Sequence, residues 1–291
     1  MLPPPPQAIR RIVLFDMDET LGIFGDFGAF MDILNTKLQH IHNSRPFSIY
    51  DHFNELLDLY PELLRPRILD IMKFLAQMKR VGKCANVMIY TNNTGPISWS
   101  NHIKDYFNAK AGYPVFDKVI GAFKRPNGEL VEVGRRSHDK TYDDFVRCSE
   151  MVGTFEVFFI DDCVHPGMHA ENVYVINVKP YKRKILLHEF VVRFKRSDLF
   201  KRLQLKPDHV AGIGAMTGAA AAYSDKEYEV DKLVGVTILE KLHEFFEDTD
   251  YSAGGGKLHT RSIRRKRLKV SARRGTHLNV TRKNGKMGRL F

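Results

Sequence analysis

The sequence has few cysteines: among its 291 residues there are three, Cys84, Cys148 and Cys163, and no two of them lie close together. Without a Cys-x-x-Cys pair, a structural zinc site or a disulfide framework is not expected, and a reducing, intracellular environment fits better. No uninterrupted run of 18 apolar residues occurs, so we expect no membrane-spanning helix. The proline-containing segment 1–10 also lacks the apolar stretch of a signal peptide.

Acidic residues are missing from segment 252–291, which contains 13 lysines and arginines. The rest of the chain has 32 basic and 34 acidic side chains, so the formal net charge of +11 belongs to this segment and a uniformly basic nucleic-acid-binding domain is excluded. Aromatic residues are nearly absent from it, so sequence readout by base stacking is not expected. We predict a disordered basic tail that contacts nucleic acid or another polyanion non-specifically, or serves as a nuclear-import signal, in a nuclear or cytoplasmic protein.

The body of the chain contains apolar runs that alternate with helical patterns. This alternation indicates an α/β fold with a parallel central sheet and helices on both faces. Strands are expected at Arg11–Phe15, Asn86–Tyr90, Val119–Phe123, Leu130–Val133, Phe155–Ile160 and Val173–Val178. The main helices are expected at Arg65–Arg80, Ser98–Ala111, Asp139–Met151, Lys184–Leu203 and Val230–Glu247.

A mainly helical stretch, 27–64, follows the first strand as an insert. Its apolar residues are expected to form its buried face: Phe27, Phe30, Met31, Ile33 and Leu34. We expect one main domain over 11–205, followed by a Gly/Ala linker and a C-terminal helix over 206–251.

Carboxylates follow two of the predicted strands. Asp16 and Asp18 come directly after the first strand, and Asp161 and Asp162 follow Ile160. Ligands of open α/β sheets bind beyond the carboxyl ends of the strands, so these side chains are expected to converge there. Because clustered carboxylates repel one another, we predict that a divalent cation neutralises them, and Mg²⁺ suits such oxygen ligands.

Three further residues are suited to bind a phosphate at the same edge. Thr91 and Asn92 follow the strand Asn86–Tyr90 and offer neutral hydrogen-bond donors. Lys140 precedes a helix and can bring a positive charge to the site, although Lys124-Arg125 or Arg135-Arg136 could supply that charge instead. Carboxylates, a cation, a hydroxyl and a lysine together favour phosphoryl transfer.

The run Asp16–Leu21, DMDETL, resembles motif I of the haloacid-dehalogenase (HAD) superfamily, whose phosphatases have Asp-x-Asp-x-Thr after the first strand. Thr91 is similar to its second motif, Lys140 to its third and Asp161-Asp162 to its fourth, in the same order. The motif I form and Leu64-Arg65-Pro66 look like the FCP/SCP-type branch, which acts on phosphoserine in the C-terminal repeats of RNA polymerase II.

The resemblance covers about Ile12 to Tyr181, and within it the chain departs from that branch at three places. Asp162 stands where asparagine is common, the insert 27–64 is helical where the branch has a small strand insertion, and the loop Thr91–Thr94 differs from the usual small-residue loop. Phosphatase chemistry is therefore better supported than specificity for the polymerase repeats.

The resemblance implies a Rossmann-like HAD fold and a Mg²⁺-dependent phosphatase that works through an aspartyl-phosphate. In that reading, Asp16 is the nucleophile and a metal ligand, and Asp18 is the general acid and base whose backbone carbonyl faces the metal. Thr91 holds a phosphoryl oxygen, with Asn92 as an alternative donor. Lys140 neutralises charge and Asp162 binds Mg²⁺ directly. Asp161, beside it, either binds the ion directly or contacts one of its ligands.

The sequence is compatible with three functions. The first is a phosphoserine or phosphothreonine protein phosphatase. The second is a phosphatase of small metabolites or nucleotides, in which the insert 27–64 closes over the site as a cap. The third is a nucleic-acid-binding protein with a relic HAD domain, against which the intact motifs argue. His165, close to the acidic pair, is a further candidate for the lining of the site.

Overall fold

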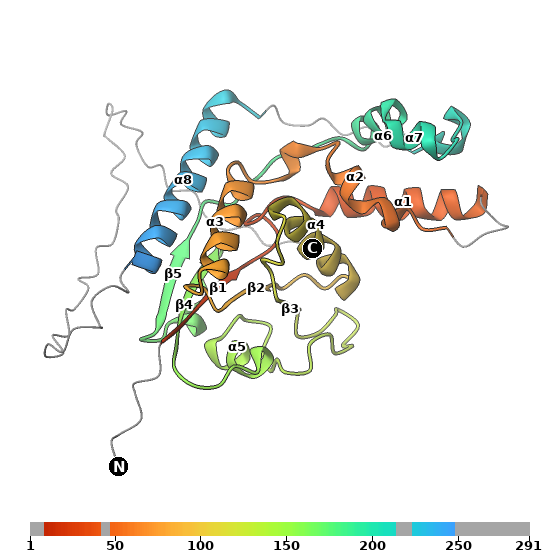
Figure 1. Ribbon diagram of the computed structural model, residues 1–291. Helices are drawn as coiled ribbons and strands as arrows, with labels where there is room; N and C mark the ends of the chain where they lie inside the picture. The colour runs from red at the N-terminus through yellow and green to blue at the C-terminus, as the bar shows by residue number, and fades with distance from the viewer. Residues whose placement is uncertain (1–8, 42–46, 214–222, 248–291) are drawn as a thin grey trace, which may run out of the picture. The chain divides into compact units, whose positions relative to one another are not determined.

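Five parallel strands run through the described part of the chain in the spatial order β3-β2-β1-β4-β5 (Figure 1). The structure is a computed structural model that describes residues 9–41, 47–213 and 223–247. The strands are β1 Arg10–Phe15, β2 Asn86–Tyr90, β3 Lys118–Ile120, β4 Phe155–Asp161 and β5 Val173–Asn177. In the register of the sheet, Phe15 of β1 pairs with Ile89 of β2 and with Ile160 of β4, so these three strands end at the same level.

The strand residues alternate between two apolar clusters, one on each face of the sheet. Val13 and Phe15 belong to the larger cluster, and Ile12 and Leu14 belong to the smaller one. Both faces are buried, which is why the strands are continuously apolar in sequence. The larger cluster is covered by α3 and α4 among others, and the smaller one by α5 (Figure 1). The predicted α/β fold with helices on both faces of a parallel sheet is confirmed.

The helices follow the expected order along the chain. They are α1 Gly25–Ile41, α2 Phe53–Leu57, α3 Ile68–Arg80, α4 Ile97–Ala111, α5 Tyr142–Ser149, α6 Leu187–Arg196, α7 Asp198–Arg202 and α8 Asp225–Glu247. Short 3-10 turns lie at Ile49–His52, Pro61–Leu63, Pro166–Met168 and Pro207–Val210. Among the residues that the structure describes, none of the helices has the length and apolar character to span a membrane.

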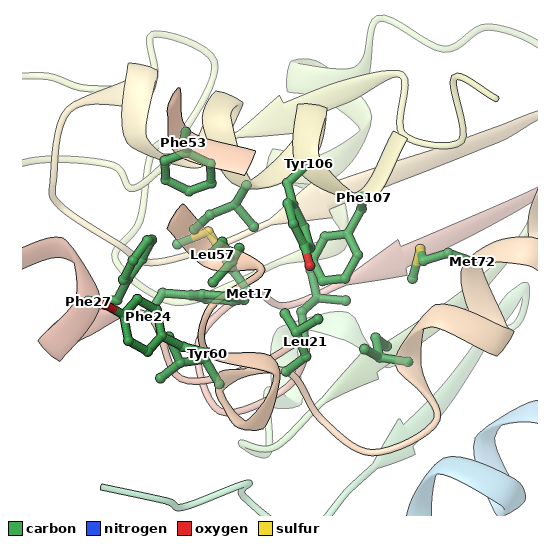
Figure 2. Packing of buried hydrophobic residues seen from close by; sticks show 14 of the residues in the cluster. Met17, Leu21, Phe24, Phe27, Phe53, Leu57, Tyr60, Met72, Tyr106 and Phe107 are labelled. Carbon is green, nitrogen blue, oxygen red and sulfur yellow. The ribbon is translucent and has the colours of Figure 1, made fainter. Parts of the chain in front are cut away.

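The insert after β1 packs through aromatic side chains beside α4 and α6. The ring of Phe27 on α1 lies 5.6 Å from that of Phe53 and 6.1 Å from that of Trp99 on α4. Phe30 stacks on Phe190 of α6 at 5.2 Å. Figure 2 shows Phe27, Phe53 and Tyr60 from the insert around Met17 and Phe24, next to the loop that follows β1.

The predicted buried face of the insert is wrong at one residue, Ile33. Phe27, Phe30, Met31 and Leu34 are buried, but Ile33 is 38% exposed. At 3.6 residues per turn, Ile33 lies beside the apolar stripe of α1 rather than on it.

The strand predicted at Leu130–Val133 is also wrong. This segment forms a turn with one isolated antiparallel bridge between Lys124 and Leu130, and Val133 is 82% exposed. An apolar run forms a strand only when it can pair with a neighbouring strand and pack on an apolar layer. This segment does neither. The helix α4 begins at Ile97 after Pro96, one residue before the predicted start at Ser98.

The C-terminal helix α8 packs closely on the segment before α3. A Cβ atom added at Gly235 would lie 2.4 Å from the carbonyl oxygen of Pro66, so only glycine permits this approach. The fully buried Asp231 accepts hydrogen bonds from Lys179 Nζ at 2.7 Å and Tyr223 Oη at 2.6 Å. Most of the predicted N-terminal segment 1–10, much of the Gly/Ala linker and the basic tail 252–291 lie outside the described residues.

Candidate active site

The carboxyl ends of β1, β2 and β4 open into one cavity of about 500 Å³. It lies where the chain leaves β1 and β4, the two neighbouring strands at which the strand order reverses, and ligands of such sheets bind at this crevice. The backbone N–H of Asp16 donates to the carbonyl of Ile160 at 2.9 Å, which ties the end of β1 to β4. All residues proposed from sequence line this cavity: Asp16, Asp18, Thr91, Asn92, Lys140, Asp161 and Asp162.

Lys140 is the cation that joins the two strand ends. Its side chain is 2% exposed, and its ammonium contacts a carboxylate oxygen of Asp16 and lies 2.7 Å from Oδ2 of Asp161. Among the lysines and arginines that the sequence offered, Lys140 is therefore the one that meets these carboxylates in the described structure. A buried ammonium is tolerated because two carboxylates neutralise it and accept its hydrogen bonds.

Thr141, the residue after Lys140, is held by hydrogen bonds through its backbone and its side chain. Thr141 caps the N-terminus of α5, where its side chain accepts a hydrogen bond from the backbone N–H of Asp144 at 3.1 Å. Tyr90, the last residue of β2, accepts a hydrogen bond at its hydroxyl from the backbone N–H of Thr141 at 3.1 Å. The strand β2 and the helix α5 therefore fix the backbone next to Lys140.

The two carboxylates on either side of Lys140 differ in their electrostatics. Burial raises the pKa of Asp16 to about 6; the charge of Lys140 opposes this rise, and the charge of Asp161 adds to it. Burial also acts to raise the pKa of Asp161, but hydrogen bonds from His165 and Lys140 and the charge of Lys140 outweigh it, so that pKa falls below its ordinary value. Asp161 is thus ionised in the neutral range.

Asp18, two residues after Asp16, faces the same cavity. Burial raises its pKa, while a hydrogen bond from the side-chain amide of Asn93 at 2.8 Å opposes the rise. A carboxyl group with a raised pKa keeps its proton to higher pH, which suits a general acid. The sequence pointed to Asn92 but not to Asn93, because a polar loop gives no sign of which amide turns toward the carboxylate.

Asp161, the last residue of β4, is buried, whereas its neighbour Asp162 is half-buried. Ligand atoms of Asp161, Asp162 and Cys163 lie within 4.8 Å of one another. Thr20 Oγ1 donates to a carboxylate oxygen of Asp162 at 3.2 Å and accepts from its backbone N–H at 3.1 Å, which links this pair to the loop after β1.

The donor set of the cavity fits a hard divalent cation. Five carboxylates, those of Asp16, Asp18, Glu19, Asp161 and Asp162, line the cavity with two lysines, Lys140 and Lys182, so acidic groups are in excess. Carboxylate oxygens are the ligands that Mg²⁺ prefers, whereas the thiol of Cys163 is a poor ligand for it. Burial and neighbouring charges also raise the pKa of the Cys163 thiol to about 11, so it stays protonated.

The loop that follows β2 is held in place by a buried arginine, Arg135. The sequence offered this arginine only as an alternative source of positive charge. Arg135 Nη1 donates to the backbone carbonyl of Thr91 at 3.1 Å and to the side-chain oxygen of Asn92 at 2.8 Å. Arg135 Nη2 donates to the carbonyls of His138 and Asp139, just before Lys140. The arginine therefore holds backbone in place, and it leaves the charge at the carboxylates to Lys140.

Arg65 likewise holds backbone in place, in the loop after β1. Its buried guanidinium donates to the carbonyl oxygens of Thr20 at 2.6 Å, Glu19 at 2.5 Å and Lys179 at 2.9 Å. The sequence marked this arginine only as part of Leu64-Arg65-Pro66, before a helix. The contacts join three segments that are far apart in the chain, which local patterns do not reveal.

His165 also lies in the site, as considered from sequence. Its Nε2 is 3.3 Å from Oδ2 of Asp161, on the same oxygen that Lys140 contacts. No protein-family model, curated protein or solved structure matches the chain. The function is therefore inferred from the geometry of the cavity together with the four motifs of the sequence.

Proposed function

We propose that the protein is a Mg²⁺-dependent phosphatase of the HAD type that hydrolyses phosphomonoesters through an aspartyl-phosphate on Asp16. The observation that carries the proposal is the buried Lys140 ammonium in contact with Asp16 and Asp161, with Asp18 in the same cavity. An anionic nucleophile next to a fixed positive charge, with a second carboxyl group that retains its proton, is suited to attack phosphorus.

In the first step, a carboxylate oxygen of Asp16 forms a bond to phosphorus while the bond from phosphorus to the ester oxygen breaks. Asp18 gives its proton to that leaving oxygen, and its raised pKa supports this role. In the second step, the ionised Asp18 takes a proton from water as the water oxygen attacks phosphorus. Asp16 is then released as a carboxylate together with inorganic phosphate.

The other residues of the cavity stabilise the charge on the transferring group. Lys140 offsets negative charge on the phosphoryl oxygens. The Thr91 hydroxyl, at the end of β2, and the amide of Asn92 are the proposed donors to a phosphoryl oxygen.

Four acidic residues would hold the metal: Asp16, Asp161 and Asp162 through carboxylates, and Asp18 through its backbone carbonyl. The ion supplies positive charge that draws the phosphate into a cavity rich in carboxylates.

A phosphoprotein is the substrate class that we favour. Among the described residues, none from the insert 27–64 lines the catalytic cavity, and the insert packs beside α4 and α6. A cavity that the insert does not cover accommodates a phosphoserine or phosphothreonine on a protein surface, as in the FCP/SCP-type branch that the motifs resemble. Closure of the insert as a cap over a small metabolite receives less support.

The test is hydrolysis of para-nitrophenyl phosphate by the wild type and by Asp16→Asn, with Mg²⁺ and with EDTA. We expect Mg²⁺-dependent turnover in the wild type and a loss of about a thousandfold or more in Asp16→Asn, because the amide is a poor nucleophile. Asp105→Asn on α4, a matched change at a side chain that is 65% exposed, should retain wild-type turnover.

Equal turnover by the wild type and Asp16→Asn would refute the proposed nucleophile. Absence of turnover in the wild type with Mg²⁺, for this ester and for phosphoserine peptides, would refute the phosphatase assignment and favour the relic domain.

A further inference from the structure

A second cavity, also of about 500 Å³, adjoins the catalytic one. Asn93 lines both cavities, and it is the residue whose amide donates to Asp18. The second cavity lies between the insert helix α1 and the start of α4, and we call it the insert groove. A substrate whose phosphate occupies the catalytic cavity can therefore extend past Asn93 into the insert groove.

Four of the thirteen residues that line the insert groove carry aromatic rings: Phe24, Tyr50, Trp99 and His102. Tyr50 and Trp99 line it together with His102, whose ring stacks on Tyr50 at 5.3 Å. The helix α1 approaches Trp99 closely at Gly28, where an added Cβ would lie 3.2 Å from the indole ring. The groove is thus a built site, in which two elements are brought together around flat side chains.

The charge of the insert groove is negative. Asp32 on α1 lines it, and no lysine or arginine of the described residues does. One carboxylate oxygen of Asp32 accepts a hydrogen bond from the Tyr50 hydroxyl at 2.5 Å. In the described part of the chain, its other oxygen has no hydrogen-bond partner and the side chain forms no ion pair. Burial also lowers the pKa of His102, which is therefore neutral near pH 7.

We propose that the insert groove binds an arginine side chain of a phosphopeptide substrate, within about four residues of the phosphorylated residue. This inference rests on the proposed phosphatase function and assigns its substrate class. Asp32 supplies the carboxylate for the guanidinium and Tyr50 supplies an aromatic face, while Trp99 lines the groove with only 9% of its surface exposed.

Arginine fits these walls better than other basic groups do. A planar guanidinium stacks on aromatic rings and can pair with a carboxylate through two parallel N–H bonds, whereas an ammonium does neither. A peptide fits better than a small cationic phosphomonoester, because two adjoining cavities of about 500 Å³ each exceed what a small ester would fill. An extended peptide advances about 3.3 Å per residue, so an arginine a few residues away can reach the groove.

The experiment uses phosphoserine peptides in which one arginine is moved from position −4 to +4, each paired with a glutamine version. Release of phosphate gives the ratio of kcat/KM for arginine over glutamine at each position. We expect a ratio of about ten or more at one or two positions for the full-length wild type with Mg²⁺, and a ratio near two for Asp32→Asn. Asp26→Asn, at an exposed position of the same helix outside the groove, should keep the wild-type ratio.

A binding measurement keeps the inference testable when turnover fails. Fluorescence anisotropy of the same labelled peptides with Asp16→Asn reports affinity without hydrolysis, and the best arginine peptide should bind about tenfold more tightly than its glutamine pair. Equal kcat/KM and equal affinity for the two peptides at every position would overturn the groove assignment even if para-nitrophenyl phosphate is hydrolysed. Tighter binding of arginine peptides without any turnover would support the groove while refuting the phosphatase.

Discussion

At the scale of single residues, the candidate site depends on a lysine that is fully surrounded by protein. Lys140 lies between Asp16 and Asp161, and removal of its charge leaves two buried carboxylates beside each other. Breaking a buried ion pair by removing one partner is destabilising because the remaining charge has no compensation. The same charge is the one proposed to offset the phosphoryl oxygens, so stability and activity are coupled here.

For Lys140→Met we expect turnover of para-nitrophenyl phosphate to fall about a hundredfold or more, as for loss of one charge-stabilising donor. The free energy of unfolding should fall by about 3 kcal/mol, measured by urea denaturation without metal. Lys124→Met changes a lysine that packs on Phe123 at 4.8 Å away from these carboxylates, and it should leave turnover near the wild-type value. Wild-type turnover in Lys140→Met would contradict the assigned role.

Arg65→Lys tests the residue that joins the loop after β1 to the segment at Lys179. One ammonium cannot reproduce the forked donation to the carbonyls of Thr20, Glu19 and Lys179. Loss of such hydrogen bonds at a buried site should lower the free energy of unfolding by about 1–3 kcal/mol. We also expect kcat to fall while KM changes little, since the loop carries Asp16 and Asp18. An unchanged urea midpoint would contradict this structural role.

His102 gives the folded state a defined pH dependence. Its pKa is lowered, chiefly by burial, while the charges of Asp105 and Asp51 act in the opposite direction. The unfolded chain therefore binds the proton more tightly, and stability decreases as pH falls through the ordinary histidine value of 6.5 toward the lower folded value. Above about pH 7 the group is neutral in both states and has no effect.

We expect Tm to fall less between pH 7.5 and pH 5 in His102→Phe than in the wild type. Phenylalanine keeps a flat ring against Tyr50 and Phe53 but has no proton to bind. Differential scanning calorimetry at the two pH values gives the difference. An equal fall in both proteins would show that His102 does not contribute.

At the scale of elements, two helical segments, the insert and α8, determine which parts of the sheet and its cavity are covered. The insert packs its aromatic residues beside α4, which leaves the carboxylate cavity free of insert residues and creates the insert groove. The helix α8 covers the other end of the same apolar layer, where Ile238, Leu242 and Phe246 join the larger cluster. It is therefore part of the folded domain, although the sequence assigned it to a region after the domain.

Gly235→Ala separates packing from helix propensity in α8. Alanine favours a helix over glycine by about 1 kcal/mol, but its Cβ would lie 2.4 Å from the carbonyl oxygen of Pro66. Because backbone must move to make room, we expect a net loss of about 1–3 kcal/mol in the free energy of unfolding. Leu233→Ala, at a position of α8 that is 63% exposed, should change it by about 0.5 kcal/mol or less. A gain in stability at Gly235→Ala would contradict the close approach.

At the scale of the whole molecule, charge and chemistry are assigned to different segments. The body is close to neutral and contains the carboxylate cavity, and segment 252–291 contains the excess of basic residues. Attraction between such a segment and a polyanion weakens as salt rises, because it depends on displaced counterions. Removal of the segment should therefore change polyanion binding without changing phosphoryl transfer.

We expect a chain that ends at residue 251 to elute from heparin at much lower salt than the full chain. Its kcat for para-nitrophenyl phosphate should stay within about twofold of the full-length value, because the described cavity is formed by residues before the tail. A full-length chain in which the run Arg264–Arg267 is replaced by glutamines should elute at intermediate salt. Loss of phosphatase activity together with heparin binding would refute this separation.

The sequence alone determined the main strands and helices and the residues that follow each strand. Continuous apolar strands predict a parallel sheet, and the carboxyl ends of its strands lie at the same edge, so Asp16 and Asp161 could be placed at that edge without coordinates. That β1 and β4 are neighbours was decided by the strand order of the folded sheet. Local rules failed at Leu130–Val133, where an apolar run has no strand to pair with, and at Ile33, just outside the apolar stripe of its helix.

The tertiary structure alone decided which of the candidate cations meets the carboxylates and which residues hold the loops. Lys140 and Arg135 are five residues apart, yet one contacts Asp16 and the other holds the backbone of Thr91. It also decided that the insert lies beside α4 and that a groove continues from Asn93. Such contacts join segments far apart in the chain, and their geometry follows from the packing of whole elements rather than from local sequence.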